Sequence, residues 1–247
     1  MNDKKLPPVN GLWFGNPLST LEIMSMVSFI RNGHEYNLYT YDDLENVPQG
    51  VNIKDANEII PESEIFRSLD STGKPGSIAP FADYFRYNLI YKVGGFWADM
   101  DCICIKPWNW EEEYVFSSEN THRNVQEANI GAIKCSKNSL VMKFCIDAID
   151  KFEDKSQIPW GTSGPILLRE ALNKYGLEKY VKSWKTFCPI NWWEIHTCFT
   201  DNKSFQLTDE IYCVHINNEI IRRIGIDKNL SYHPNSIFEQ IKNWLEI

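Results

Sequence analysis

The first forty residues alternate between strand-like and helix-like patterns, and this alternation restricts the fold more than any other feature. Residues 9–14 form a short apolar segment that ends at the Gly-Asn-Pro turn signal of residues 15–17. A helix capped by Ser19 or Thr20 follows, and residues 36–41 are aromatic and β-branched, as in a second strand. Because a strand–helix–strand unit implies a parallel sheet covered by helices, we expect an α/β fold.

The remainder of the chain continues this pattern. It contains no internal repeats, low-complexity tracts or linker-like runs, so residues 1–247 are expected to form a single domain. Residues 43–76 are polar and irregular and predict only short helical pieces. Further along, we expect helices over residues 77–93, 138–152, 163–175 and 235–245, and strands over residues 96–98, 102–105, 114–117, 129–134 and 212–216.

Composition excludes several classes of partner. The 25 basic and 33 acidic residues give a net charge of −8 without any run of lysine or arginine, which argues against nucleic acid. No segment approaches the roughly 18 apolar residues of a membrane span, and the N-terminal lysines precede no apolar signal-peptide stretch. Seven cysteines without a Cys-x-x-Cys pair favour a reduced setting. We therefore expect a soluble cytoplasmic protein, with peripheral contact at the cytoplasmic face of the inner membrane left open.

Two carboxylates, Asp99 and Asp101, follow a short apolar strand. In an extended chain they point to the same side, and Met100 between them turns into the core. Neighbouring carboxylates repel unless a cation lies close, and Mg²⁺ or Mn²⁺ takes oxygen ligands while keeping positions open for phosphate. Ligands of open α/β sheets bind outside the carboxyl ends of strands. The pair therefore predicts a divalent-metal site.

The helix before this strand carries Asp83 and Arg86 on one face. As an exposed ion pair they would contribute at most about 1 kcal/mol to stability. As functional groups, Asp83 would accept a hydrogen bond from a ribose or sugar hydroxyl, and Arg86 would orient a phosphate or sugar oxygen. Their closeness in sequence to the two carboxylates favours the functional interpretation.

Tryptophans are abundant, nine in all, and several are clustered. Trp108 lies near Trp110, and Trp192 is followed directly by Trp193. These clusters are explained either by core and rim packing or by a flat platform for sugar faces or a nucleobase.

Residues 81–101, FADYFRYNLIYKVGGFWADMD, resemble the core signature of glycosyltransferase family 32. This is the Asp-x-Asp sugar-transferase family related to yeast mannosyltransferases, bacterial capsule and O-antigen enzymes and, more distantly, glucosylating toxins. Weaker likenesses to the family's first strand, Asn-bearing strand, Gly-Pro helix start and C-terminal His-centred motif lie at residues 11–15, 129–132, 164–165 and 215–223. The resemblance implies a GT-A fold, with a Rossmann-like, mostly parallel central sheet flanked by helices.

The resemblance also implies a nucleotide-sugar donor, a Mn²⁺ or Mg²⁺ ion and roles for particular residues. Asp101 would ligate the metal, Asp99 would contact ribose and metal, Trp13 would stack on the base, and His215 would approach the metal or diphosphate. The implied metal ligands are Asp99, Asp101 and His215; the catalytic residues are Asp83, Arg86, Asp99, Asp101 and Asn129; and the donor-binding residues are Leu12, Trp13, Asp83, Arg86, Gly95, Asp99, His215 and Asn218.

One segment departs from the family pattern. Many members follow the histidine with an aromatic residue and later a Ser-Trp pair, whereas this chain has Ile-Asn-Asn at residues 216–218, which leaves its diphosphate contacts open. The implied function is retaining transfer of a hexose, with a uridine nucleotide as the expected carrier, to an oligosaccharide or lipid-linked saccharide in surface polysaccharide synthesis. The alternatives are a toxin-like protein glycosyltransferase, an Asp-x-Asp phosphatase and a carbohydrate-binding module. The phosphatase is disfavoured because residues 102–104 continue as a strand, and the module because it needs no paired carboxylates.

Overall fold

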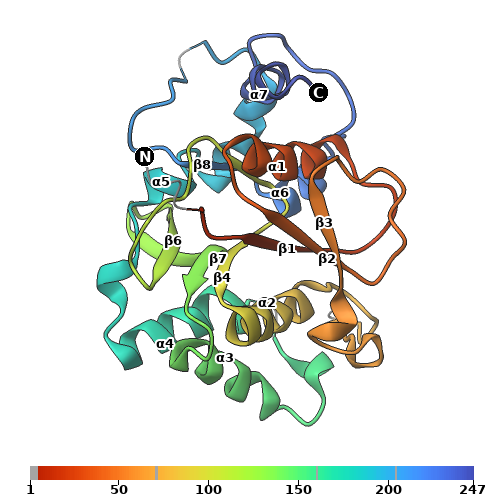
Figure 1. Ribbon diagram of the computed structural model, residues 1–247, viewed down its shortest axis with the longest axis vertical. Helices are drawn as coiled ribbons and strands as arrows, with labels where there is room; N and C mark the ends of the chain where they lie inside the picture. The colour runs from red at the N-terminus through yellow and green to blue at the C-terminus, as the bar shows by residue number, and fades with distance from the viewer. Residues whose placement is uncertain (1–4, 70–71, 160, 204) are drawn as a thin grey trace.

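A six-stranded sheet runs through the centre of the molecule (Figure 1). The computed structural model describes residues 5–69, 72–159, 161–203 and 205–247. The strand order is β3-β2-β1-β4-β7-β6, with parallel pairing from β3 to β4 and antiparallel pairing of β7 with both of its neighbours. The predicted α/β class and the mostly parallel sheet are confirmed. The strands of this sheet are β1 (Val9–Trp13), β2 (Tyr36–Thr40), β3 (Val51–Asp55), β4 (Gly95–Ala98), β6 (Val115–Asn120) and β7 (Gln126–Cys135).

Helices cover both faces of the sheet (Figure 1). On one face, α2, α3 and α4 pack against inward-facing residues such as Leu12, Trp97 and Ile133. On the other face lies α1, and α7 packs on the far side of α1. Within the described residues, no helix is long and apolar enough to cross a membrane. The helices are α1 (Thr20–Arg31), α2 (Ala79–Val93), α3 (Leu140–Asp150), α4 (Leu167–Tyr175), α5 (Trp184–Phe187), α6 (Asn218–Ile224) and α7 (Ile237–Leu245).

A small second sheet joins the middle of the chain to its C-terminal part. Strands β5 (Cys102–Cys104) and β8 (Cys213–His215) pair antiparallel, and Cys102 lies opposite His215. Helix α1 holds β5 in place, because the Ser25 hydroxyl donates to the Cys102 carbonyl at 2.8 Å and the Cys104 amide donates to the Ser28 hydroxyl at 2.8 Å. All seven cysteines are buried, and none is paired in a disulfide.

Among the segments that differ from the sequence prediction are β3 and the beginning of α4. The region 43–76 contains an additional edge strand, β3, whose Val-Asn-Ile-Lys-Asp sequence is mostly exposed and lacks the apolar alternation by which a strand is recognised. The helix expected over residues 163–175 begins only at Leu167. Before it, Thr162–Ile166 forms a wide turn in which Gly164 leaves the helical conformation (φ −93°, ψ −120°). This turn brings Ser163 onto α2, and both contribute to the site described next.

Candidate active site at the end of strand β4

The two predicted metal-binding carboxylates flank a turn between β4 and β5. The Cys102 amide donates to the Asp99 carbonyl at 3.0 Å, so the chain turns at this point instead of continuing extended as the spacing predicted. The position at the end of a buried strand is as expected. Met100 is 5% exposed and accepts a hydrogen bond from the Tyr36 hydroxyl at 3.2 Å. The turn therefore anchors Met100 in the core, with a partly exposed Asp99 before it and a buried Asp101 after it.

Asp99 is held by two donors. Its Oδ1 accepts from the indole Nε1 of Trp97 at 2.8 Å and lies 3.1 Å from Nη2 of Arg86. The Arg86 guanidinium lies 4.9 Å from the centre of the Trp97 ring and also donates to the Ile130 carbonyl. This arrangement fixes the orientation of Asp99 before any ligand binds.

Asp83 and Arg86 form a buried pair on α2. Asp83 is 7% and Arg86 5% exposed, and Nη2 of Arg86 lies 3.5 Å from Oδ1 of Asp83. The Ser163 hydroxyl donates to the other Asp83 oxygen at 2.8 Å. The exposed ion pair considered from the sequence is therefore not what the structure contains. Burying an ion pair costs desolvation, and burial of one at the edge of a cavity is typical of a functional site.

Burial and neighbouring charges shift the carboxylates differently. Burial raises the pKa of Asp83 to about 6, although Arg86 and Ser163 oppose the shift. Burial, assisted by the nearby Asp101, also raises the pKa of Asp99. Burial acts in the same direction on Asp101, but His215 and the Asn218 amide outweigh it and lower its pKa. Of these three carboxylates, Asp101 is therefore the one held most firmly in its charged form.

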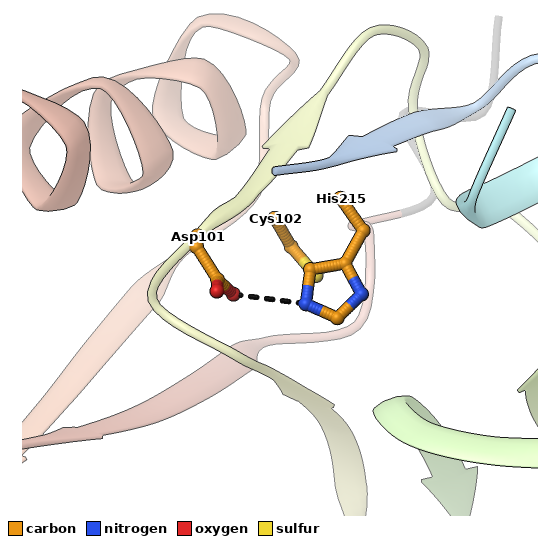
Figure 2. Close-up of side chains that lie close together, drawn as sticks. All are labelled: Asp101, Cys102 and His215. Atoms are coloured by element: carbon orange, nitrogen blue, oxygen red, sulfur yellow. Dashed lines mark ion pairs between the residues drawn. The ribbon is translucent and has the colours of Figure 1, made fainter. Parts of the chain in front are cut away.

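A possible metal centre lies between the turn and β8. Oδ1 of Asp101 lies 3.1 Å from Nε2 of His215, and Cys102 extends beside the imidazole (Figure 2). The ligand atoms of these three residues lie within 4.8 Å of one another. The buried Oδ1 of Asp101 has no hydrogen-bond partner among the described residues, while Oδ2 accepts from the Asn218 amide. The Asp101 carboxylate suits Mn²⁺ or Mg²⁺, whereas the His215 imidazole is a more usual ligand of ions such as Fe²⁺ or Zn²⁺. The Cys102 thiol, whose pKa burial raises well above its usual value, suits neither Mn²⁺ nor Mg²⁺.

Asp99 approaches the same point from the sheet. A Cβ atom at Gly131 on β7 would lie 2.8 Å from Cε1 of His215 and 3.6 Å from Oδ2 of Asp99. Asp99 and His215 therefore both lie beside Gly131, whereas the group whose ligand atoms lie within 4.8 Å of one another consists of Asp101, Cys102 and His215 and does not include Asp99.

Two cavities open beside this centre. The larger, of about 580 Å³, is lined by five of the predicted donor-binding residues and by the adjacent Asp101; the five are Leu12, Trp13, Arg86, Asp99 and Asn218. The smaller, of about 210 Å³, is lined by the predicted Asp83, Asp99, Asn129 and His215. Because Ala79 and Asp99 line both, the cavities adjoin at the carboxylate turn. Gly95 lines neither, since it begins β4 and lies beside Pro8.

Several lining residues were not predicted from the sequence. In the larger cavity, Arg222 lies within the His-centred segment and Lys228 follows it, with Nζ of Lys228 5.3 Å from the centre of the Trp13 ring. In the smaller cavity, Glu119 lies on β6, where burial raises its pKa while His215 and Asn129 oppose the shift. Arg222 lies in the segment that resembles the family's C-terminal motif, although no role was predicted for it, whereas Lys228 and Glu119 belong to no recognisable spacing and no sequence signal pointed to them.

Asn129 is fixed by the neighbouring strand. It is 4% exposed, its side-chain oxygen accepts from the Ser117 hydroxyl, and its amide nitrogen lies 3.3 Å from the Cys188 sulfur. The asparagine is therefore rigidly held at the wall of the smaller cavity, which distinguishes it from an ordinary strand-edge amide.

Comparison with known proteins identifies the same region. Residues 22–117, which include α2 and the carboxylate turn, match the family model described as "Glycosyltransferase sugar-binding region containing DXD motif". This match supports transferase activity. No curated protein matches the chain.

Among solved structures, the chain is similar to three glycosyltransferases at low identity. The PaToxG glycosyltransferase is 13% identical, with 68% of each chain covered and a TM-score of 0.47. The UDP-bound glycosyltransferase domain of the YGT toxin is 11% identical, with 95% of this chain and 81% of that chain covered and a TM-score of 0.41. The apo-form glycosyltransferase GlyE of Streptococcus pneumoniae is 13% identical, with 73% and 46% covered and a TM-score of 0.40.

Proposed function

We propose that this protein is a metal-dependent, retaining glycosyltransferase of the GT-A type. It transfers a hexose from a nucleoside-diphosphate sugar, with uridine as the expected base, to a saccharide acceptor. The observation that carries the proposal is the meeting of two cavities at Asp99, beside a buried Asp101 oxygen that faces His215. The family match to the segment containing this turn supports it.

Asp101 and His215 are the residues proposed to hold Mn²⁺ or Mg²⁺, with Asp99 contributing from the other end of the turn. The ion would supply a Lewis acid that neutralises charge developing on the leaving diphosphate. The chain's own contribution is positional. The Asn218 amide orients the Asp101 carboxylate, and Trp97 and Arg86 orient Asp99, so that little reorganisation is needed during the reaction.

The donor would lie in the larger cavity. Leu12 and Trp13 line it at the end of β1 and would contact the base, while Arg222 and Lys228 provide positive charge for the diphosphate. Arg86 sits where this cavity meets the smaller one and would hold the donor sugar together with Asp83. Retention and the family 32 assignment rest on the resemblance of residues 81–101, and no side chain is proposed as a covalent nucleophile.

The acceptor is proposed to be an oligosaccharide or a lipid-linked saccharide of surface polysaccharide synthesis. A lipid-linked acceptor would bring a cytoplasmic enzyme to the inner membrane as a peripheral protein. Protein glycosylation of the toxin type is the alternative, and an acceptor assay with both substrate classes separates the two.

The donor site is tested by measuring thermal stability with a panel of nucleotide sugars, with and without Mn²⁺. At a hundredfold excess over its dissociation constant, a true donor stabilises the native state by about 2.7 kcal/mol. For a chain of this size that corresponds to a rise in melting temperature of roughly 5–10 °C.

Asp101→Ala is expected to abolish the Mn²⁺-dependent part of this rise and to lower turnover by roughly a hundredfold or more. Asp209→Ala, at an exposed carboxylate paired with Lys106, is the matched control and should behave as wild type. Transfer by Asp101→Ala at the wild-type rate would refute the assignment.

A further inference from the structure

Three aromatic side chains form a compact cluster at the tip of the β6–β7 hairpin. The His122 ring stacks on Trp193, with 4.1 Å between ring centres and an interplanar angle of 25°. Trp192 stands nearly perpendicular to both, at 76° to His122 and 86° to Trp193. His122 is exposed and both indoles are partly exposed, so the cluster presents ring surface to solvent.

Core packing does not explain this cluster. Within the part of the chain that the structure describes, neither Trp192 nor Trp193 belongs to the three apolar clusters that form the core or packs against them. By contrast, Trp97 and Trp108 are buried members of those clusters. From the sequence, packing was the favoured role for the Trp192–Trp193 pair and a platform the alternative, whereas the structure favours the platform.

Two segments of the chain link the cluster to the smaller cavity. Glu119, which lines that cavity, precedes His122 by three residues, so their Cα atoms are at most about 10 Å apart. In the other, Trp192 begins a short 3₁₀ segment (Trp192–Phe199) that packs against α6. Asn217, immediately before α6, also lines the cavity. A ligand with the length of a short oligosaccharide could therefore contact the rings and the cavity together.

We propose that His122, Trp192 and Trp193 form a binding subsite for a pyranose ring of the saccharide acceptor. This inference rests on the proposed function. Indole rings offer large apolar faces for the C–H face of a sugar, together with an N–H donor at the edge. Because the three rings already brace one another, little side-chain entropy is lost on binding, which favours affinity.

Glu119 and Asn129 receive the reacting end of the same acceptor. Both line the smaller cavity, where Asp83, Asp99 and His215 form the rest of the wall. A carboxylate accepts hydrogen bonds from sugar hydroxyls, and an amide can donate or accept. Glu119 is thus a positioning residue that orients an acceptor hydroxyl toward the donor sugar, while the aromatic subsite holds the next ring.

The test compares Trp192→Ala, Trp192→Phe and the control Trp244→Ala, whose indole is 37% exposed on α7, beside a separate apolar pocket. Two activities are measured for each variant. Hydrolysis of the nucleotide sugar in the absence of acceptor reports the donor site, and transfer to the best member of a panel of fluorophore-tagged oligosaccharides reports the acceptor site.

For Trp192→Ala we expect donor hydrolysis within about twofold of wild type and an acceptor KM raised by about tenfold, the equivalent of one lost ring contact. Trp192→Phe should recover most of the affinity, and Trp244→Ala should leave both activities unchanged. An acceptor KM that is unchanged in Trp192→Ala overturns the subsite while leaving the proposed function intact.

If the wild-type protein hydrolyses no nucleotide sugar, the proposed function fails and the subsite is judged separately. Saturation-transfer NMR with the same tagged oligosaccharides then measures binding directly. Binding that is weakened in Trp192→Ala but kept in Trp244→Ala supports the aromatic subsite. Binding that is absent in wild type, or equal in both variants, overturns it.

Discussion

Replacing Asp83 by Asn tests whether the site carries a destabilising buried charge. Burial raises the pKa of Asp83 from 3.8 to about 6, even though Arg86 and Ser163 favour its ionised form. The folded protein therefore binds a proton at Asp83 more tightly than the unfolded chain does. By linkage, this group's contribution to stability is greatest below pH 3.8 and falls as the pH rises through 6.

The size of the effect follows from the pKa difference. Raising the pKa from 3.8 to about 6 corresponds to about 3 kcal/mol, at 1.36 kcal/mol for each pKa unit. About 2 kcal/mol of this develops between roughly pH 4.5 and pH 7.5, because the unfolded carboxyl is already partly ionised at the lower value. An amide has the shape of the neutral carboxyl and carries no charge. Asp83→Asn should therefore be more stable than wild type by about 3 kcal/mol at about pH 7.5 and by about 1 kcal/mol at about pH 4.5.

Urea unfolding at the two pH values, in EDTA and without nucleotide, measures the difference. The control is Asp147→Asn on α3, whose side chain is 52% exposed and which should show little pH-dependent gain. In parallel, Asp83→Asn should lose most transferase activity, because the proposed sugar contact needs a carboxylate. A stability difference between Asp83→Asn and wild type that is the same at both pH values would refute the buried-charge argument.

Two further changes examine the walls of the site. In Gly131→Ala the added Cβ would lie 2.8 Å from Cε1 of His215, so the imidazole must move. We expect the free energy of unfolding, measured in urea without metal, to fall by about 1–3 kcal/mol, and the Mn²⁺-dependent thermal stabilisation to disappear. Unaltered stabilisation by Mn²⁺ would contradict this geometry. Arg86→Lys keeps the charge but loses the planar group that contacts Asp83, Asp99 and the Ile130 carbonyl together. We expect kcat/KM to fall by roughly a hundredfold, and a fall of less than about threefold would show that charge alone suffices.

Much of the fold could be predicted because local signals agreed with one another. Helix α2 has proline in its first turn and glycine directly after its last residue, and the apolar strand that follows ends on the carboxylates. Asp83 and Arg86 were identified because helical spacing and closeness in sequence to Asp99 pointed the same way. What was missed depends on contacts between distant parts of the chain. Strand β3 pairs along an exposed edge without an apolar pattern, and the carboxylate turn is closed by a backbone hydrogen bond that spacing does not reveal.

The unpredicted cavity residues are explained in the same way. Glu119 lies beyond the strand that the sequence indicated, since the apolar pattern ends at Ser117 whereas pairing with β7 continues to Asn120. Lys228 reaches Trp13 and Glu22 from the other end of the chain. No spacing rule connects positions so far apart. The sequence predicted Cys102 as a residue of a strand, and its closeness to His215 is evident only from the pairing of β5 with β8 in the structure.

The ligands of the proposed metal centre come from two parts of the protein that are held in place by different contacts, because β5 pairs with β8 from the C-terminal part of the chain. Asp99 is held by the large sheet and α2, whereas His215 depends on a strand of three residues near the end of the chain. Short elements with few partners open more easily than the core, so β8 could detach while the six-stranded sheet stays intact. In that opened state the carboxylates would remain and the imidazole would be lost. The protein's affinity for its metal would then measure how firmly its C-terminal part is docked, and substitutions far from the carboxylates could weaken metal binding without unfolding the domain.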